Sequence, residues 1–223
     1  TFKLREGVKW HDGKPFTAND VKCTWDLLQD KGQAKLRKNP RKAWYTNLKE
    51  VTVDNDFQAT FHLDRPQPAF IALLASGYSP VYPCHVPPKT MRTAPVGTGP
   101  FKFVELKQNE RIVFTKNQDY WKPGKPYLDG ITWTIIKSRA TRMLAFTAGE
   151  FDMTMTHGLP TPSLRELARE NPKAHCDLTT TGGTANLIVN REKPPFDNPD
   201  IRTAMALTID RDAFNKILGE GTH

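Results

Sequence analysis

Histidine and cysteine are the residues of this chain best suited to metal binding or catalysis, but their spacing favours neither. Six histidines are scattered along the sequence without HxxxH or HExxH spacing: His11, His62, His85, His157, His175 and His223. A zinc site needs several such ligands brought together. The sequence also has no GxSxG motif, and no cysteine has the local signature of a protease nucleophile. We therefore expect no metal, no cofactor and no enzymatic activity.

The cysteines leave the question of a disulfide open. Three are present, Cys23, Cys84 and Cys176, and they are too few and too scattered for a disulfide framework or a CxxC metal site. An odd number leaves at least one free thiol. One disulfide among the three is possible on this evidence, and the sequence does not select the pair.

Two glycine-rich stretches invite comparison with phosphate-binding loops. In Gly97-Thr98-Gly99, the following Pro100 lacks the amide that a phosphate would need, and no Gly-Lys-Ser/Thr follows. We expect a tight turn that enters a strand. Gly182-Gly183-Thr184 also lacks a lysine and precedes an expected strand. We predict a phosphate site at neither stretch.

Aromatic residues in polar, loop-like surroundings are a more suggestive group. They are Trp44, Tyr45, Tyr78, Tyr82, Trp121 and Trp133. Packing in a core is the usual role of any one of them. The alternative is an aromatic wall of a ligand cleft, which gives broad contact with little specificity.

Length and charge limit the class of protein. The 223 residues suffice for one large domain with a substantial core, and 38% of them are hydrophobic. The longest apolar run, Ala69 to Ala75, is far shorter than the ~20 residues of a transmembrane helix. The net charge of +8 and the basic stretch Lys31 to Lys42 raise the alternative of a nucleic-acid-binding module. No zinc-finger, RNP or GXXG pattern accompanies them, so we favour a solvated surface.

The elements that must position these residues alternate between strands and helices. Alternating hydrophobicity predicts strands, in chain order, at Phe2–Val8, Val51–Val53, Phe57–Leu63, Phe101–Leu106, Arg111–Lys116, Ile131–Ile136, Phe151–Met155, Cys176–Thr180 and Ala185–Val189. Helical spacing and caps predict helices from Thr17 to Leu28, Ser138 to Ala148, Pro162 to Glu170, Asn198 to Leu207 and Asp210 to Leu218. Phe70–Leu74 fits a short buried helix or strand. Hairpins early and a βαβα run late indicate a mixed α/β fold.

Several stretches together resemble one known family. They are Thr1 to Gly13 with Phe16 to Val21, Val96 to Phe101 with Asn117 to Trp121, Ala148 to Asp152, and Asn190, Pro195-Phe196 and Arg202 to Arg211. In this order and spacing the chain is similar to the family 5 extracellular solute-binding proteins of bacterial ABC transporters, the dipeptide, oligopeptide and nickel-binding group. The matching residues sit at expected caps, turns and strand entries, so they specify a fold and not a catalytic site.

The resemblance implies an architecture of two lobes with a ligand between them. It is the α/β, periplasmic-binding-protein type II-like architecture, and the chain would be a fragment truncated at both ends. Residues 1–95 would form an extra subdomain of lobe I. Residues 96–181 would belong to the core sheet of lobe I, and residues 182–223 to the crossover and the beginning of lobe II.

The resemblance also implies a function and a location. The chain would belong to the substrate-binding component of an ABC importer, a periplasmic monomer, or an extracellular one tethered to the membrane of a Gram-positive cell. It would capture a peptide or a similar small solute and deliver it to the membrane permease subunits, without binding nucleic acid. By region, the family's ligand contacts correspond to Trp44, Tyr45, Met155, Thr156, His157, Gly183, Thr184 and Asn186. Nickel chelates, oligosaccharides and opines are other ligands in this family.

Overall fold

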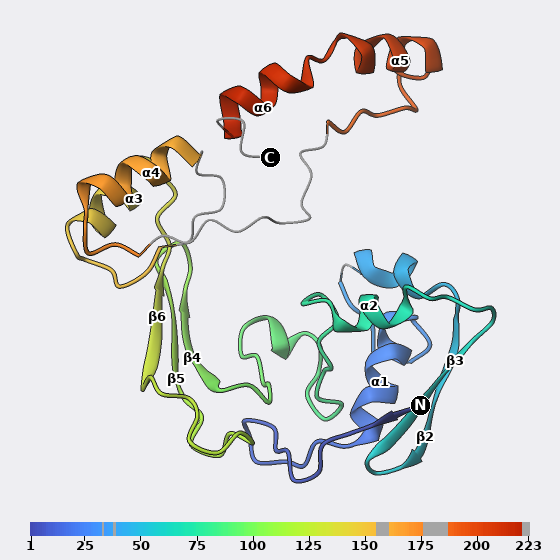
Figure 1. The fold of residues 1–223 in the computed structure, drawn as a ribbon. Coiled ribbons are helices and arrows are strands. Elements are labelled where there is room, and N and C mark those ends of the chain that lie inside the picture. Colours follow the sequence, from blue (N-terminus) through green and yellow to red (C-terminus); the bar gives the residue numbers. More distant parts are fainter. Residues whose placement is uncertain (33, 38, 155–160, 176–186, 220–223) are drawn as a thin grey trace. The chain divides into compact units, whose positions relative to one another are not determined.

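The computed structural model describes residues 1–32, 34–37, 39–154, 161–175 and 187–219. The chain divides into two compact units, Thr1–Ile136 and Lys137–His223. Both contain helices, and the first contains two antiparallel sheets (Figure 1). The division after Ile136 lies at neither of the boundaries expected near residues 95 and 181. The assignment of segments to lobes stays a prediction.

The first sheet of the first unit is built on a β-hairpin. Strands β2 (Leu48–Asn55) and β3 (Gln58–Leu63) pair antiparallel, and β1 (Phe2–Lys3) joins the other side of β3. The predicted hairpin is therefore confirmed. The alternation of polar and apolar residues in the two strands leaves one face of this sheet apolar, and a helix covers it.

Helix α1 (Ala18–Leu28) covers that face. Its buried side chains recur at helical spacing, as predicted, and pack on residues of both strands. The cluster consists of Ala18, Val21, Trp25, Leu28, Tyr45, Leu48, Val51, Ala59 and Phe70. The last of these lies in α2 (Phe70–Ala75), so the ambiguous apolar run is a helix. This cluster is the best-packed part of the described chain.

The expected strand Phe2–Val8 is much shorter than predicted. Only Phe2–Lys3 lies in a strand, because the chain turns away from the sheet at Gly7, whose φ is +73°. Glycine adopts this left-handed conformation without the steric cost that a side chain would bring. The segment that follows lies outside the sheet and leads to the start of α1.

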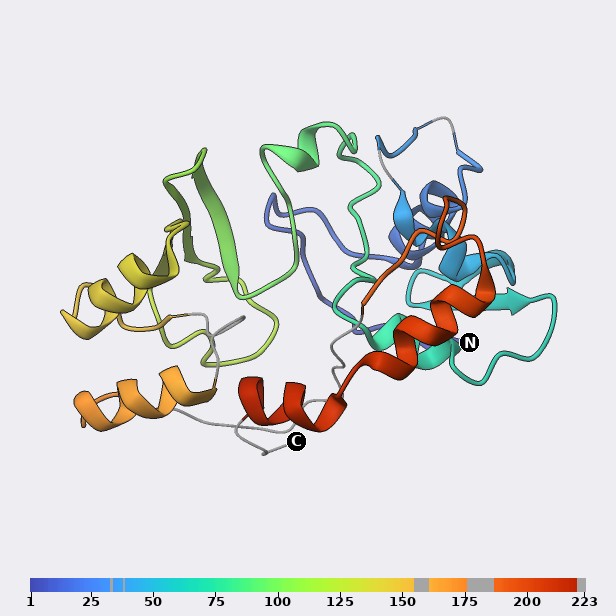
Figure 2. The ribbon, with the colours of Figure 1, turned by 90° about the horizontal axis from the view of Figure 1, so that it is seen from above.

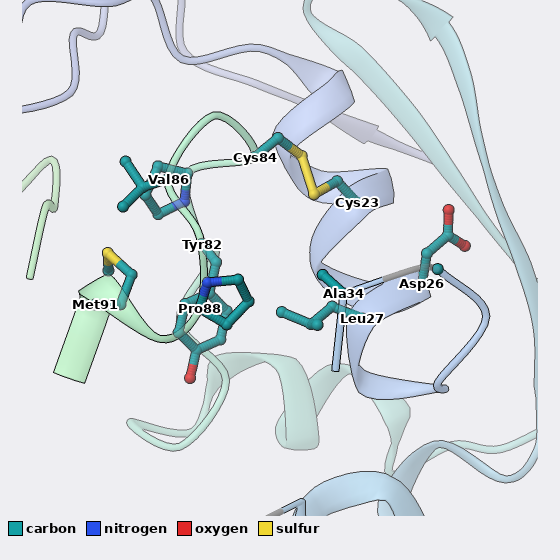
Figure 3. Close-up of a pocket in the computed structure, with 11 residues that line it drawn as sticks. Cys23, Asp26, Leu27, Ala34, Tyr82, Cys84, Val86, Pro88 and Met91 are labelled. Atoms are coloured by element: carbon teal, nitrogen blue, oxygen red, sulfur yellow. A yellow bond between two sulfur atoms is a disulfide. The ribbon is translucent and has the colours of Figure 1, made fainter. Parts of the chain in front are cut away.

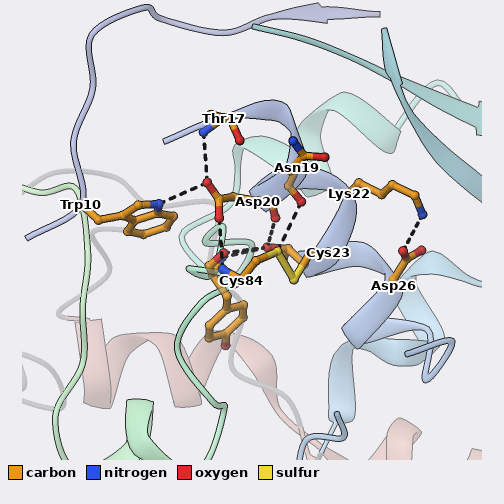
Figure 4. The surroundings of a disulfide bond; sticks show 10 residues. Trp10, Thr17, Asn19, Asp20, Lys22, Cys23, Asp26 and Cys84 are labelled. Carbon is orange, nitrogen blue, oxygen red and sulfur yellow. Dashed lines mark hydrogen bonds and ion pairs between the residues drawn. A yellow bond between two sulfur atoms is a disulfide. The ribbon is translucent and has the colours of Figure 1, made fainter. Parts of the chain in front are cut away.

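A disulfide fastens the loop after α2 to α1. Cys23 and Cys84 are bonded, which selects the pair that the sequence left open (Figure 4). Near it, the amide of Tyr82 donates to Thr24 Oγ1 at 2.8 Å, and the amide of Cys84 donates to Asp20 Oδ1 at 3.0 Å. The loop then forms the short 3-10 helix η2 (Thr90–Arg92). The remaining cysteine, Cys176, lies outside the described residues.

The second sheet has the order β4-β5-β6 and contains the other predicted hairpin. Its strands are β4 (Phe101–Lys107), β5 (Arg111–Lys116) and β6 (Gly130–Thr134). The register pairs Phe103 with Phe114 and Phe114 with Ile131, so these residues lie on one face. The sheet follows directly from the turn at Gly97–Gly99, as the sequence predicts.

The described part of the second unit is helical. It contains α3 (Arg139–Thr147), α4 (Thr161–Glu170), α5 (Pro199–Thr208) and α6 (Arg211–Gly219), and α4 and α6 are in contact (Figure 2). The predicted caps are confirmed where they are described: Ser138 Oγ accepts from Thr141, and Asp210 Oδ1 accepts from Ala213. Gly149 ends α3 with a φ of +78°.

The strands predicted after Gly149 are not found where the structure describes those residues. Residues 151–154 and 187–189 form no strand in the described structure, so the strands predicted there are wrong over those residues. Gly149 turns the chain at the end of α3, and the described residues after it join no ladder. The predicted strand Cys176–Thr180 lies outside the described residues. Among the helices that are described, none is both long and apolar enough to cross a bilayer.

Candidate ligand-binding site

The eight residues predicted to contact a ligand are described only in part. Trp44 and Tyr45 lie in the first unit. The other six lie outside the described residues: Met155, Thr156, His157, Gly183, Thr184 and Asn186. A common role of these six residues with Trp44 and Tyr45 therefore stays a prediction.

Trp44 and Tyr45 are neighbours in one short 3-10 helix but have opposite environments. This helix, η1 (Pro40–Tyr45), follows the basic stretch and precedes β2. Tyr45 is only 1% exposed, its ring packs against Trp25 at 5.9 Å, and its hydroxyl lies 2.6 Å from Ser79 Oγ. Trp44 is 36% exposed. Tyr45 thus belongs to the core in this structure, which leaves Trp44 as the aromatic surface of η1.

An exposed aromatic pair extends this surface. The ring of Trp44 meets the ring of Tyr78 edge to face at 6.1 Å, and Tyr78 is 70% exposed. Arg41, also in η1, donates to the Tyr78 carbonyl and, at 2.9 Å, to the Tyr82 hydroxyl. Two aromatic faces beside a guanidinium can stack on planar groups and attract a carboxylate. We call Arg41, Trp44 and Tyr78 the aromatic edge.

Sequence reasoning found only part of the aromatic edge. Tyr78 was one aromatic residue among several in loops, and Arg41 was one cation in a basic stretch. Nothing in their sequence positions connects them, because 37 residues separate the two. The only available signal was the adjacency of Arg41 to Trp44 within one helical turn.

Three cations of the basic stretch, Lys31, Arg41 and Lys42, are engaged within the chain. Lys42 pairs with Asp30 at 2.6 Å, and this hydrogen bond lowers the pKa of Asp30. Lys31 donates to the Lys49 carbonyl, and Arg41 is held as described above. These contacts fit a solvated surface better than a free cationic patch prepared for phosphates.

A small apolar pocket lies elsewhere in the same unit (Figure 3). Its volume is about 260 Å³, and it lies between the end of α1 and the loop after α2. Mainly apolar side chains and the disulfide line it: Cys23, Leu27, Ala34, Tyr82, Pro83, Cys84, Val86, Pro88 and Met91. Asp26 also borders it, but its carboxylate is paired with Lys22 at 2.6 Å. Of the predicted ligand contacts that the structure describes, neither Trp44 nor Tyr45 lines this pocket.

The glycines of the 97–99 turn face a histidine. The amide of Gly97 donates to His11 Nδ1 at 3.2 Å, and His11 Nε2 bonds the Gly99 carbonyl at 3.0 Å. A phosphate would need the Gly97 amide that His11 already uses. This contact agrees with the prediction of a structural turn. Nor do the described residues contain a group of three or more histidine, cysteine or acidic side chains that could hold a metal ion.

Comparison with known proteins gives a consistent result. The family model described as "Bacterial extracellular solute-binding proteins, family 5 Middle" matches residues 1–223. The periplasmic oligopeptide-binding protein OppA of Haemophilus influenzae is 29% identical over 244 residues, which cover 99% of this chain and 44% of OppA.

Solved structures support the same relationship. H. influenzae OppA in complex with the peptide RPPGFSPFR superposes with a TM-score of 0.79 at 27% identity, over 99% of this chain and 46% of OppA. MoaA of A. tumefaciens R10, in complex with mannopinic acid, gives 0.78 at 28% identity, over 98% and 44%. The chain thus spans less than half the length of these relatives. Because the family model matches the chain from end to end, the chain belongs to the bacterial extracellular solute-binding proteins, family 5.

Proposed function

We propose that this chain is part of the substrate-binding component of a bacterial ABC importer, and that the protein captures peptides. The observation that carries the proposal is the match of the whole chain to family 5, together with its likeness to a structure that holds a nonapeptide. Ligand would be trapped between two lobes whose closure it favours, and the closed form would dock on membrane permease subunits. The protein would work as a monomer in the periplasm, or outside a Gram-positive cell.

The aromatic edge supports a peptide as ligand. Trp44 and Tyr78 offer ring faces that can pack on backbone and side chains alike, which suits a binder that tolerates different sequences. Arg41 adds a cation that can attract a carboxylate. The residues predicted from the family, with Met155, Thr156 and His157 in one region and Gly183, Thr184 and Asn186 in another, would complete the contacts.

Calorimetric titration of the intact protein tests this proposal. A library of di- to hexapeptides and the peptide RPPGFSPFR are titrated in parallel with mannopinic acid and a nickel–histidine chelate. We expect micromolar or tighter binding of at least one peptide. Binding of the opine or the chelate with no heat from any peptide would overturn the peptide assignment and keep the transport role.

Variants of the aromatic edge locate the site. Trp44→Ala and Tyr78→Ala should each raise the peptide Kd about tenfold, since an aromatic contact contributes on the order of 1.5 kcal/mol. Trp133→Ala is the matched control, because Trp133 is another partly exposed tryptophan of the first unit, on strand β6. Equal effects of all three variants would show that the aromatic edge has no special role.

A further inference from the structure

His11 connects the two stretches that are most characteristic of this sequence. It lies in Trp10-His11-Asp12-Gly13, and its partners lie in Gly97-Thr98-Gly99, 86 to 88 residues later. Three hydrogen bonds join them: the His11 amide donates to the Gly97 carbonyl at 2.8 Å, and the two ring nitrogens bond Gly97 and Gly99. The imidazole is thus held at both nitrogens.

These bonds require one protonation state of the ring. Nδ1 accepts the Gly97 N–H, so it carries no proton, and Nε2 must then donate to the Gly99 carbonyl. Only the neutral imidazole has one donor and one acceptor. In the protonated ring both nitrogens are donors, so Nδ1–H would face the Gly97 N–H and that bond would be lost.

The contact between His11 and Gly97 is close, and further hydrogen bonds connect it to the second sheet. A Cβ on Gly97 would lie 3.3 Å from His11 Cε1, so a side chain at this position would push against the ring. The Gly99 carbonyl also accepts from Asn117 Nδ2 at 3.0 Å, and the Asn117 amide donates to the Pro100 carbonyl at 2.8 Å. Asn117 directly follows β5 and is buried. His11 therefore links the segment before α1 to the end of the second sheet.

A second histidine nearby can keep its hydrogen bond in either protonation state, because its Nε2–H can donate to a carboxylate in both forms. His85 Nε2 lies 2.6 Å from Asp12 Oδ2, and the ring of His85 packs against Trp10. Protonation of His85 turns this contact into an ion pair. The other charged groups of the surrounding elements are Asp12 itself with Lys9 and Lys14 of the same segment, and Asp20, whose Oδ2 accepts from Trp10 Nε1. Beyond the turn, Lys102 pairs with Asp119 at 3.8 Å. Residues 96–101 contain no titratable side chain.

We propose that His11 is a pH-sensitive latch between the segment before α1 and the 97–99 turn, closed when the imidazole is neutral and opened by its protonation. Histidine is the side chain whose ordinary titration falls between pH 5 and 8, so the latch can be tested across that range. The Asp12–His85 contact does not weaken as His85 gains its proton, so it keeps the neighbouring loop in place. The inference does not depend on which ligand the protein carries.

Amide hydrogen exchange of the intact protein tests the latch. Protection factors are compared at pH 7.5 and 5.5, because they remove the intrinsic pH dependence of exchange. We expect protection at the Gly97 amide to fall about tenfold at pH 5.5. In His11→Gln it should stay constant, because glutamine offers one acceptor and one donor but does not titrate. His62→Gln is the matched control, since His62 bonds Thr52 on the first sheet, and it should behave like the unmodified protein.

A second measurement covers the case in which His11→Gln does not fold. Nitrogen-15 NMR of the unmodified protein at pH 7.5 should show His11 as the Nε2–H tautomer, and the Gly97 amide should shift as this ring titrates. An Nδ1–H tautomer would overturn the proposal. So would Gly97 protection that is equal at both pH values, or that falls equally in the unmodified protein and in His11→Gln.

Discussion

The two units of this chain differ in what holds their helices in place. In the first unit, α1 buries a continuous face against β2 and β3, and a disulfide and the Asp20 carboxylate tie it to a distant loop. In the described part of the second unit only Ala145, Leu164 and Leu167 are buried, whereas Leu207 is 80% and Ile217 74% exposed. The first unit therefore depends on tertiary packing, and α5 and α6 depend mainly on their caps and local sequence.

This difference shows why similar signals for the start of a helix contribute unequally to stability. Each of α1 and α6 has an acidic residue at its start that accepts a hydrogen bond from a nearby amide: Asp20 in the first turn of α1, and Asp210 just before α6. Asp210 bonds only the amide of Ala213. Asp20 is buried and accepts from Trp10 and Thr17, which precede α1, and from Cys84 in the loop after α2 (Figure 4). A cap that also joins distant segments contributes much more than a cap that serves one helix.

The largest expected loss of stability comes from a substitution at the centre of the buried face of α1. Trp25→Ala should lower the free energy of unfolding by about 4 kcal/mol, because it empties a site where the ring packs against Tyr45 and Phe61. Leu207→Ala on α5 should change it by less than about 0.5 kcal/mol, as for an exposed residue. Urea unfolding of this 223-residue chain, in which Leu207 is 80% exposed, measures both values. Comparable losses would mean that the α5 residue is packed as tightly as the α1 residue.

Loss of the disulfide should lower the free energy of unfolding by nearly as much as Trp25→Ala. Cys23 and Cys84 are 61 residues apart, and opening a loop of that size lowers stability by about 4 kcal/mol in the chain-entropy treatment. The double variant Cys23→Ser/Cys84→Ser tests this in urea unfolding under non-reducing conditions. Cys176→Ser serves as the control. A double variant as stable as the control would show that the bond does not constrain the unfolded chain.

A smaller contrast is expected between the two helix-capping carboxylates. Asp20→Ala leaves three donors without their acceptor and should cost about 3 kcal/mol, whereas Asp210→Ala removes one cap and should cost about 1 kcal/mol. The same unfolding assay separates them. If Asp20→Ala cost no more than Asp210→Ala, the proposed role of Asp20 in joining the start of α1 to the loop after α2 would be unsupported.

The smallest expected change in stability comes from the substitution of Asp12. Burial raises its pKa, but the hydrogen bond and charge of His85 and the amide of Lys14 outweigh this and hold the pKa below the ordinary 3.8. A lowered pKa stabilises the fold above the ordinary value, and this contribution is lost as pH falls through the folded pKa. Asp12→Asn should therefore be slightly less stable than the unmodified protein at pH 6, and the difference should vanish near pH 2. If the difference in stability between the two proteins did not change with pH, the lowered pKa of Asp12 would be excluded as its cause.

Local elements of the fold were predictable from the sequence. The two hairpins, α1 with its inward face, the start of α3 at Ser138 and its end at Gly149 all follow from signals within a few residues. The strand from Phe2 was overestimated because the alternation continues past the point where Gly7 turns the chain. The strand at 151–154 was wrong because a short apolar alternation forms a strand only when a neighbouring strand pairs with it.

The candidate site was predictable only in part, since its members come together from distant positions. Trp44 was found from its residue type, but Tyr78 and Arg41 join it only through the fold. Tyr45, the neighbour of Trp44, lies in the core. Adjacent residues of one helical turn point in different directions, and which one faces the interior depends on where the sheet and α2 lie.

By itself the sequence determined the family, the mixed α/β class and the positions of most helices and hairpins, because caps, turns and periodicity act over a few residues. The tertiary structure alone decided that Cys23 pairs with Cys84, that Asp20 accepts from the Cys84 amide, and that His11 hydrogen-bonds the 97–99 turn. Each of these contacts joins residues far apart in the chain. Their distance in space follows from how the helices and sheets pack, and no local pattern encodes it.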